Sequence, residues 1–81
     1  ATLSNLAGLY RDQSRFAQAE LLYRRAIAID EKTLGPDHPD LATDLEGYAV
    51  LLRKTNREAD AARLEARAKA IRAKQAQNPP K

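Results

Sequence analysis

The chain of 81 residues contains no cysteine, and its only aromatic residues are three tyrosines and one phenylalanine. Without cysteine it can form neither disulfides nor thiolate metal sites. No segment approaches the roughly 20 consecutive apolar residues of a membrane helix, and the first residues lack the basic-then-apolar pattern of a signal peptide. We therefore expect a soluble, cytoplasmic chain with a small, mostly aliphatic core.

Residues that commonly carry catalysis are also scarce. His38 is the only histidine, and it lies in one short segment with Asp37 and Asp40. A metal site needs three or four donors that converge at about 2 Å, and no second cluster of donors accompanies this segment. The chain has no glycine-rich phosphate loop and no serine in a nucleophile elbow. We therefore expect no enzyme activity, no metal site and no cofactor.

The net charge of +3 hides an uneven distribution along the chain. Residues 1–52 carry five basic and eight acidic side chains, a net charge of −3, whereas residues 53–81 carry nine basic and three acidic ones, a net charge of +6. In the basic part, Arg63, Arg67 and Lys74 fall on one side of a helix. Such a stripe could follow phosphates, but no aromatic residue accompanies it. We expect a solvated helix surface here, and neither nucleic acid nor a membrane as partner.

The chain matches itself when it is shifted by 42 residues, with 13 identities in the 39 overlapping positions and no gap. The identical pairs are Leu3/Leu45, Ala7/Ala49, Leu9/Leu51, Arg11/Arg53, Arg15/Arg57, Ala17/Ala59, Ala19/Ala61, Leu22/Leu64, Arg25/Arg67, Ala26/Ala68, Ala28/Ala70, Ile29/Ile71 and Lys32/Lys74. A period of roughly 20 to 50 residues is typical of repeat arrays, in which each unit buries its apolar face on its neighbour. The sequence therefore predicts an α-solenoid fragment that functions by contact.

Apolar residues recur at three- and four-residue steps in four segments, which predicts four amphipathic helices. These helices cover about residues 2–13, 16–33, 39–54 and 57–76. Gly35 suits the end of the second helix, and Pro39 suits the first turn of the third. Ser14 and, 42 residues later, Asn56 are expected to cap the starts of the second and fourth helices. The proline-containing tail 77–81 cannot continue the fourth helix.

These features resemble the tetratricopeptide repeat, and in particular the 42-residue variety found in kinesin light chains and their bacterial relatives. The matching residues are Leu3, Leu6, Ala7 and Tyr10 in the first helix and Ala19, Tyr23 and Ala26 in the second. Residues 26–39 resemble the end of the second helix and the loop between repeats in that subfamily. The resemblance implies an all-α fold of two stacked antiparallel helix hairpins, with residues 1–39 as one repeat and 40–76 as the next.

The second repeat departs from the first where charge replaces large apolar side chains. Phe16, Leu21, Tyr23 and Ile27 correspond to Glu58, Arg63, Glu65 and Lys69. We expect these positions on the face that packs on a following repeat, and a terminal repeat needs a polar face there. The second repeat therefore resembles a C-terminal cap. Because Ala1 begins inside a helix, we expect the chain to be the end of a longer, bacterial-type array.

In this family the first helices of successive repeats line a groove that holds a peptide. The resemblance carries this role to Ser4, Asn5, Gly8, Arg11 and Asp12 in the first repeat and to Glu46, Val50, Arg53 and Lys54 in the second. Arg11 and Arg53 are equivalent, and arginine binds carboxylates through paired N–H donors, which favours an acidic peptide or a terminal carboxylate. The alternative is that both arginines only keep the helices soluble. For Asn5, whose counterpart is Gly47, the alternative is a bond to nearby backbone.

We therefore expect a protein–protein interaction module that binds a peptide or partner segment in this groove. The alternative function is structural: the chain would homo-oligomerise through its uncovered N-terminal side, with Leu3, Leu6 and Tyr10 as the self-association face. Roughly three repeats are normally needed for a stable array, and two repeats alone would favour self-association.

Overall fold

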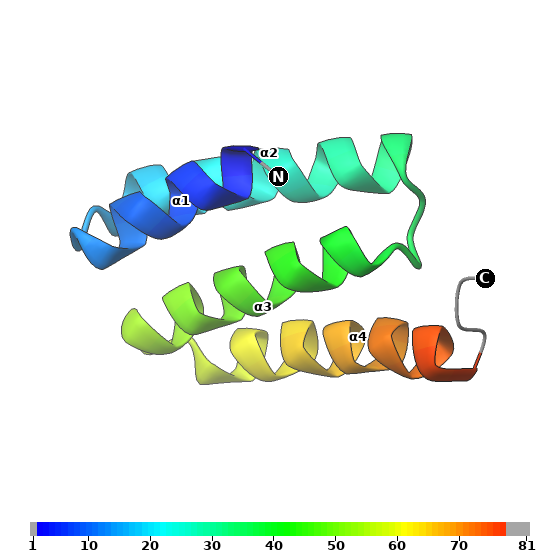
Figure 1. Ribbon diagram of the computed structural model, residues 1–81. Coiled ribbons are helices and arrows are strands. Elements are labelled where there is room, and N and C mark those ends of the chain that lie inside the picture. The colour runs from blue at the N-terminus through cyan, green and yellow to red at the C-terminus, as the bar shows by residue number, and fades with distance from the viewer. Residues whose placement is uncertain (1, 78–81) are drawn as a thin grey trace.

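The computed structural model describes residues 2–77, and within this range it contains four helices and no strand. The helices are α1 (Thr2–Asp12), α2 (Phe16–Thr33), α3 (Pro39–Lys54) and α4 (Glu58–Gln77). α1 pairs with α2, and α3 with α4, in two antiparallel hairpins (Figure 1). The all-α fold is thus confirmed, and each helix begins and ends within one residue of its expected bounds. Of the predicted tail, Gln77 closes α4 and the rest lies outside the described residues.

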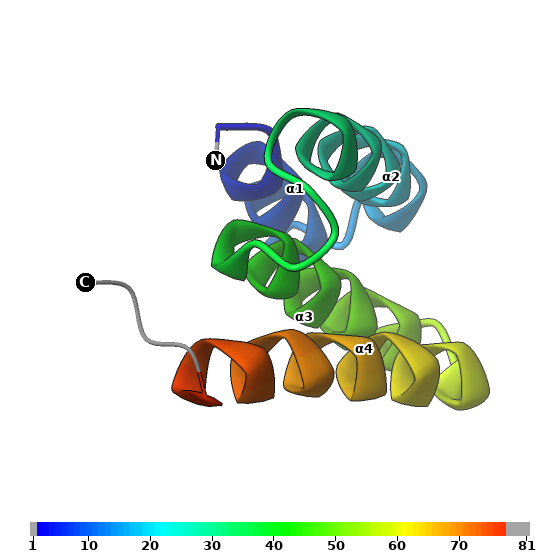
Figure 2. The same ribbon diagram turned by 90° about the vertical axis from the view of Figure 1, so that its right-hand side faces the viewer.

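α3 is the central helix of the stack. It packs against α4, against α2 and, over a shorter length, against α1. Figure 2 shows this arrangement from the end of the molecule, with α1 and α2 above α3 and with α4 below it. Its buried residues are Leu41, Ala42, Asp44, Leu45, Tyr48, Ala49, Leu51 and Leu52. Burial on several sides explains why apolar residues cover so much of the circumference of α3, while the outer helix α4 has a narrower apolar stripe.

Buried alanines allow the two helices of each hairpin to lie close together. Ala7 of α1 and Ala19 of α2 are fully buried in one hairpin, as are Ala49 of α3 and Ala61 of α4 in the other. All four belong to the same apolar cluster, which therefore runs through both hairpins. The 42-residue period of the sequence thus corresponds to one repeated helix contact, and the alanine pairs occupy the same place in each copy.

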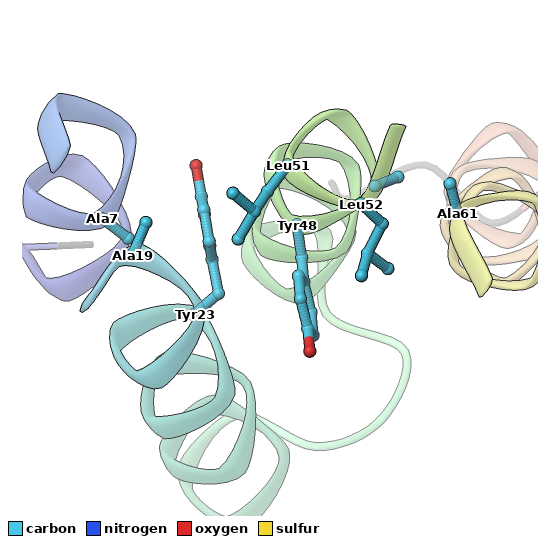
Figure 3. Close-up of a cluster of buried hydrophobic side chains, with 8 residues drawn as sticks. Ala7, Ala19, Tyr23, Tyr48, Leu51, Leu52 and Ala61 are labelled. Carbon is cyan, nitrogen blue, oxygen red and sulfur yellow. The ribbon is translucent and has the colours of Figure 1, made fainter. Parts of the chain in front are cut away.

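Two tyrosines join the hairpins across the α2–α3 contact. The rings of Tyr23 and Tyr48 are stacked, with their centroids 5.9 Å apart and their planes inclined by 8°. Figure 3 shows the rings face to face between α2 and α3, with the hydroxyl groups pointing in opposite directions. An offset stack of this kind adds about 0.5–1.5 kcal/mol to the burial of the two rings. It also sends the Tyr23 hydroxyl to one side of the molecule and the Tyr48 hydroxyl to the other.

The predicted helix caps Ser14 and Asn56 are wrong. Both residues have a left-handed backbone, with φ of 62° and 63°, and both lie just after the preceding helix. The N–H groups of Arg15 and Arg57, the next residues, donate to the carbonyls of Tyr10 and Leu52, each at 2.8 Å. These bonds form Schellman motifs, which satisfy carbonyls at a helix end. Ser14 and Asn56 therefore end α1 and α3 instead of starting α2 and α4.

The loop between the hairpins has the end and start signals that the sequence predicts. Gly35 has a φ of 94°, a conformation that favours glycine, and its N–H donates to the carbonyl of Asp30 at 3.2 Å. Pro39 occupies the first turn of α3, and the imidazole of His38 caps that helix, because its Nδ1 accepts the N–H of Asp40 at 3.1 Å. The single histidine thus has a local structural partner.

Candidate functional site

A groove lies between α1 and α3, the first helices of the two hairpins. It is a hollow of about 430 Å³. Its lining residues are Ser4, Asn5, Gly8, Leu9, Arg11, Asp12, Tyr23, Thr43 and Gly47. Most of them are small or polar, so a partner's backbone could approach α1 and α3 closely and find hydrogen-bonding groups there. A concave surface with a few convergent polar groups is what a peptide-binding site requires.

Tyr23 forms the floor of the groove, and Gly47 makes room for it. A Cβ atom on Gly47 would lie 2.8 Å from Cε1 and 2.9 Å from the hydroxyl oxygen of Tyr23, which is closer than van der Waals contact allows. A Cβ on Gly8 would lie 3.6 Å from the same hydroxyl, an ordinary contact. The tyrosine ring therefore reaches up from α2 between α1 and α3 only because Gly47 lacks a side chain.

Arg11 fixes the Tyr23 hydroxyl at the groove floor. Its guanidinium Nη1 donates to the hydroxyl oxygen at 2.9 Å and to the carbonyl of Gly47 at 3.4 Å. The same guanidinium pairs with Asp12 through Nε at 3.4 Å. Burial raises the pKa of Tyr23, so this hydroxyl keeps its proton at neutral pH. Arg11 thus links α1, α2 and α3 at one point of the groove.

The structure places the nine expected groove residues in two groups. The five on α1, from Ser4 to Asp12, all line the groove. The four on α3 do not line this hollow: Glu46 pairs with Arg72, Arg53 pairs with Glu65, and Val50 and Lys54 are exposed. α3 instead contributes Thr43 and Gly47 to the lining.

Arg11 and Arg53 occupy equivalent positions but meet different partners. Arg53 donates from Nε to Glu65 at 3.1 Å and also from Nη2, which lowers the pKa of that carboxyl below its usual value. Glu65 corresponds to Tyr23, the partner of Arg11. Each arginine therefore binds the same position of its own hairpin. An acidic ligand at Arg53 would have to displace Glu65, whereas Arg11 bonds a neutral hydroxyl and one neighbouring carboxylate.

The groove floor contains residues that the sequence did not assign to the site. Tyr23 was expected to face the following repeat, and it does stack on Tyr48, but its hydroxyl also enters the groove. Gly47 and Thr43 were not assigned a role at all. The signal for Gly47 was present, because a lone glycine within a helical pattern often marks a close approach of another group.

Three basic residues of α4 pair with acidic residues from the rest of the chain. Arg67 contacts Glu31 of α2 at 2.7 Å, Arg72 contacts Glu46 of α3 at 2.7 Å, and Lys74 contacts Asp37 of the loop at 3.0 Å. Hydrogen bonding from Arg72 lowers the pKa of Glu46. Part of the uneven charge of the sequence thus becomes charge complementarity between α4 and the preceding elements.

A polar cluster on the opposite side of the α2–α3 contact is centred on Glu20. Its carboxylate accepts the Tyr48 hydroxyl at 2.6 Å, lies 3.0 Å from Arg57 in the turn before α4, and lies 3.4 Å from Arg24. The bond from Arg57, followed by that from Tyr48, lowers the pKa of Glu20. These contacts join α2 to α3 and to the segment before α4.

The predicted self-association residues lie on an open side of α1. Leu6 is 39% exposed, and Leu3 and Tyr10 are partly exposed. Leu6 and Tyr10 line a hollow of about 460 Å³ together with Leu21 and Leu22 of α2. We call Leu3, Leu6, Leu9 and Tyr10 the N-terminal face; Leu9, which is 53% exposed, also borders the groove.

Leu21 does not lie where the sequence analysis placed it. It is 68% exposed, beside Leu6 and Tyr10, and not on the face of α2 that packs against the next hairpin. The helical period explains the difference. Phe16, Tyr23 and Ile27 share one side of α2, whereas Leu21 is displaced from Phe16 by about 140° at roughly 100° per residue.

Over residues 2–77, no three His, Asp or Glu side chains gather closely enough to hold a metal ion. The carboxylate of Asp40 lies 3.9 Å from Nδ1 of His38, but that nitrogen already accepts the Asp40 N–H, and Asp37 pairs with Lys74. No helix of the described part of the chain is long and apolar enough to cross a membrane.

The fold and the groove define a two-hairpin fragment of an α-helical repeat protein. Comparison with protein families identifies the repeat: the tetratricopeptide repeat matches residues 1–74, which include α1 to α3 and most of α4. The chain therefore belongs to the tetratricopeptide repeat family, whose members generally mediate protein–protein contacts and are typically not catalytic. No match to a curated protein was found.

Proposed function

We propose that this chain binds an extended segment of a partner protein in the groove between α1 and α3. The observation that carries the proposal is the hollow itself, which lies between the first helices of adjacent repeats over a floor of Tyr23 and Gly47. An extended peptide presents N–H and C=O groups that need partners when water is displaced. Asn5 and Thr43 offer such partners along the groove wall.

We further infer that an acidic group of the partner would bind at Arg11 more readily than at Arg53. Arg11 bonds a neutral hydroxyl and has one carboxylate at 3.4 Å, while Arg53 is already held by both carboxylate oxygens of Glu65. The 42-residue spacing of equivalent positions supports assignment to the kinesin light chain-like variety of the repeat. The charged residues Glu58, Glu65 and Lys69 support α4 as the C-terminal cap of an array.

Position 8 provides the test of the groove. Gly8→Val would fill the hollow with the residue that the second repeat carries at the equivalent position, Val50, so the helix should tolerate it. Peptides selected on the chain from a random library should lose at least tenfold in affinity on Gly8→Val. Val50→Ala lies outside the hollow and is the matched control. Unchanged affinity of the Gly8→Val chain, with the helix content intact, would exclude the groove as the binding site.

Self-association through the N-terminal face is the second candidate function. It is favoured by the exposure of Leu6 and Leu9 beside the apolar hollow at Leu21 and Leu22. We rank it second because the end of the molecule that would meet this face in a head-to-tail stack is charged, at Glu58 and Glu65 among others. Sedimentation across a concentration series tests it: a mass of 9.0 kDa at all concentrations excludes the candidate.

A further inference from the structure

Two buried carboxyl groups lie beside the wall of the groove. Asp30 of α2 and Asp44 of α3 are 6% and 1% exposed, and the Oδ2 atom of neither has a hydrogen-bond partner among the described residues. In α3, Asp44 directly follows Thr43 and precedes Gly47 by three positions, and both of these residues line the groove. A change of charge at Asp44 therefore takes place next to the surface that a bound partner would cover.

The two carboxyl groups share a hydrogen bond that requires a proton. Asp44 is hydrogen-bonded to Asp30, and a carboxyl group can donate such a bond only when it is protonated. Burial, followed by this bond, raises the pKa of Asp44 to about 6. Loss of the proton leaves two like charges in contact, away from water, which is costly. The pair therefore changes its charge close to neutral pH.

Asp44 is connected to both the wall and the floor of the groove. The hydroxyl of Ser4, which lines the groove from α1, hydrogen-bonds to Asp44 and favours its charged form against the effect of burial. At the floor, burial raises the pKa of Tyr23, and the negative charges of Asp12 and Asp44 act in the same direction. The charge of Asp44 thus acts on the hydroxyl to which Arg11 donates at 2.9 Å.

An occupied groove favours the protonated pair in three ways. A partner that covers the groove removes water from near the carboxyl groups, which disfavours their charged form. A partner carbonyl that accepts the Ser4 hydroxyl removes a hydrogen bond from the carboxylate of Asp44. An acidic group bound at Arg11 places a further negative charge near Asp44. All three effects have the same sign, so the bound chain holds the proton more tightly than the free chain does.

We propose that binding of a partner in the groove is coupled to the uptake of a proton by the Asp30–Asp44 pair, so that the chain holds an acidic, extended segment more tightly in mild acid than at neutral pH. This inference rests on the proposed function of the groove and adds its regulation by pH. Because binding raises the pKa of Asp44, the gain in affinity is complete below the pKa of the free chain and is lost as the pH rises through the pKa of the complex.

The test uses a peptide selected on the chain at pH 5.5 that loses affinity on Gly8→Val, contains no histidine and has blocked ends. Calorimetric titration at pH 6.5, in buffers with different enthalpies of ionisation, measures the protons taken up on binding. We expect net uptake, and an affinity at least about threefold higher at pH 5.5 than at pH 7.5. Circular dichroism should show the same helix content at both pH values.

Variants of the pair assign the proton to its site. Asp44→Asn, which resembles the protonated acid, should bind at pH 7.5 as tightly as the unchanged chain does at pH 5.5, with no proton uptake. Asp30→Asn removes the like charge beside Asp44, so the uptake should move to lower pH. Asp60→Asn, at an exposed aspartate of α4, is the matched control and should leave the uptake unchanged.

Two other groups that titrate near neutral pH are controlled separately. His38→Asn removes the only histidine and keeps a residue that can cap α3. The α-amino group favours the charged form of Asp44 and itself titrates in this range, so the measurements are repeated on the chain with an acetylated α-amino group. Proton uptake should persist in both cases.

The outcomes separate this inference from the proposed function. A peptide that depends on Gly8 but binds equally at both pH values, without proton uptake, would overturn the coupling and leave the groove as the binding site. Uptake that persists in Asp44→Asn, or that disappears in His38→Asn, would also overturn the coupling. If no selected peptide depends on Gly8, the proposed function fails and the coupling fails with it.

Discussion

Asp30 of α2 and Asp44 of α3 bury their carboxyl groups against each other at the junction of the two hairpins. They are 6% and 1% exposed, and the Oδ2 atom of neither has a hydrogen-bond partner within residues 2–77. Burial, followed by the hydrogen bond with Asp30, raises the pKa of Asp44 to about 6, although a bond from Ser4 acts in the opposite direction. Since two adjacent carboxylates cannot both ionise at low cost, the junction between the repeats is sensitive to protons.

The first prediction is that the chain is most stable in mild acid. Asp44 has a pKa of about 6 in the folded chain against an ordinary value of 3.8, so between these values the folded state binds more protons. The stabilising contribution of protonated Asp44 should therefore be complete below about pH 4 and be lost as the pH rises through 6. The resulting loss in the free energy of unfolding at pH 7.5 is about 3 kcal/mol, at 1.36 kcal/mol per pKa unit. Urea unfolding at pH 4.5 and pH 7.5 measures this difference in the free energy of unfolding.

Asp44→Asn separates this effect from other titrations. The amide resembles the protonated acid in size and hydrogen bonding, so it should stabilise the chain at pH 7.5 by about 1–3 kcal/mol and have little effect at pH 4.5. Asp60→Asn, at an exposed aspartate of α4, is the matched control and should act by less than about 0.5 kcal/mol. Equal effects of Asp44→Asn at both pH values would show that the junction does not respond to protons.

The second prediction compares the two glycines beside Tyr23. Gly47→Ala places a Cβ 2.8 Å from the tyrosine ring, which is held by its stack on Tyr48, so overpacking of about 1–3 kcal/mol should outweigh the gain of about 1 kcal/mol in helix propensity. Gly8→Ala meets the Tyr23 hydroxyl at 3.6 Å and should be neutral or stabilising. The melting temperatures of both variants, measured by thermal unfolding, test this prediction. Equal melting temperatures would mean that Tyr23 can move without cost.

The sequence predicted the helices because their signals are local, and it missed contacts that depend on how the helices cross. The spacing of apolar residues indicates the four helices, and Gly35 and Pro39 mark the end of α2 and the start of α3. The prediction that Ser14 and Asn56 cap the starts of α2 and α4 was wrong, because residues that favour helix starts also tolerate the left-handed backbone that ends a helix. The family resemblance placed candidate groove residues on α1 that line the hollow, whereas the residues of α3 that border it depend on the angle at which α3 passes α1. No local pattern encodes that angle.

Partners of charged residues were equally hidden in the sequence. Arg53 and Arg11 are identical in the repeat alignment, yet one meets Glu65 and the other Tyr23 because position 23 and its equivalent differ. The basic stripe of α4 was expected to face solvent alone, and the structure pairs its Arg67 with Glu31, 36 positions earlier. Such ion pairs can be identified only when the relative positions of both helices are known.

The third prediction concerns the bond between Arg11 and Tyr23. Tyr23→Phe removes the acceptor of the 2.9 Å bond from Nη1, and because Arg11 is only 20% exposed its guanidinium regains little water. We expect a loss of about 1.5 kcal/mol in the free energy of unfolding, at the low end for hydrogen bonds to charged groups. Tyr10→Phe, which alters a partly exposed tyrosine of α1, should leave stability unchanged. A loss as large in Tyr10→Phe would mean that the hydroxyls act through something other than Arg11.

The fourth prediction concerns the charge complementarity of α4. Arg72 donates to both carboxylate oxygens of Glu46, at 2.8 Å and 2.7 Å, but the two side chains are 47% and 46% exposed, so water screens much of their attraction. A double-mutant cycle with Arg72→Gln and Glu46→Gln should give a coupling of about 0.3–1 kcal/mol near neutral pH. Because Arg72 lowers the pKa of Glu46, this contribution is present above the ordinary glutamate pKa and is lost as the pH falls below it.

In about 1 M salt, where charges are screened within roughly 3 Å, the coupling between Arg72 and Glu46 should decrease as well. Arg63→Gln, at an exposed α4 arginine with no carboxylate within 4.0 Å among residues 2–77, should show no coupling to Glu46→Gln. A coupling between Arg72 and Glu46 that is independent of both pH and salt would mean that packing of the two side chains, and not their charge, holds α4 against α3.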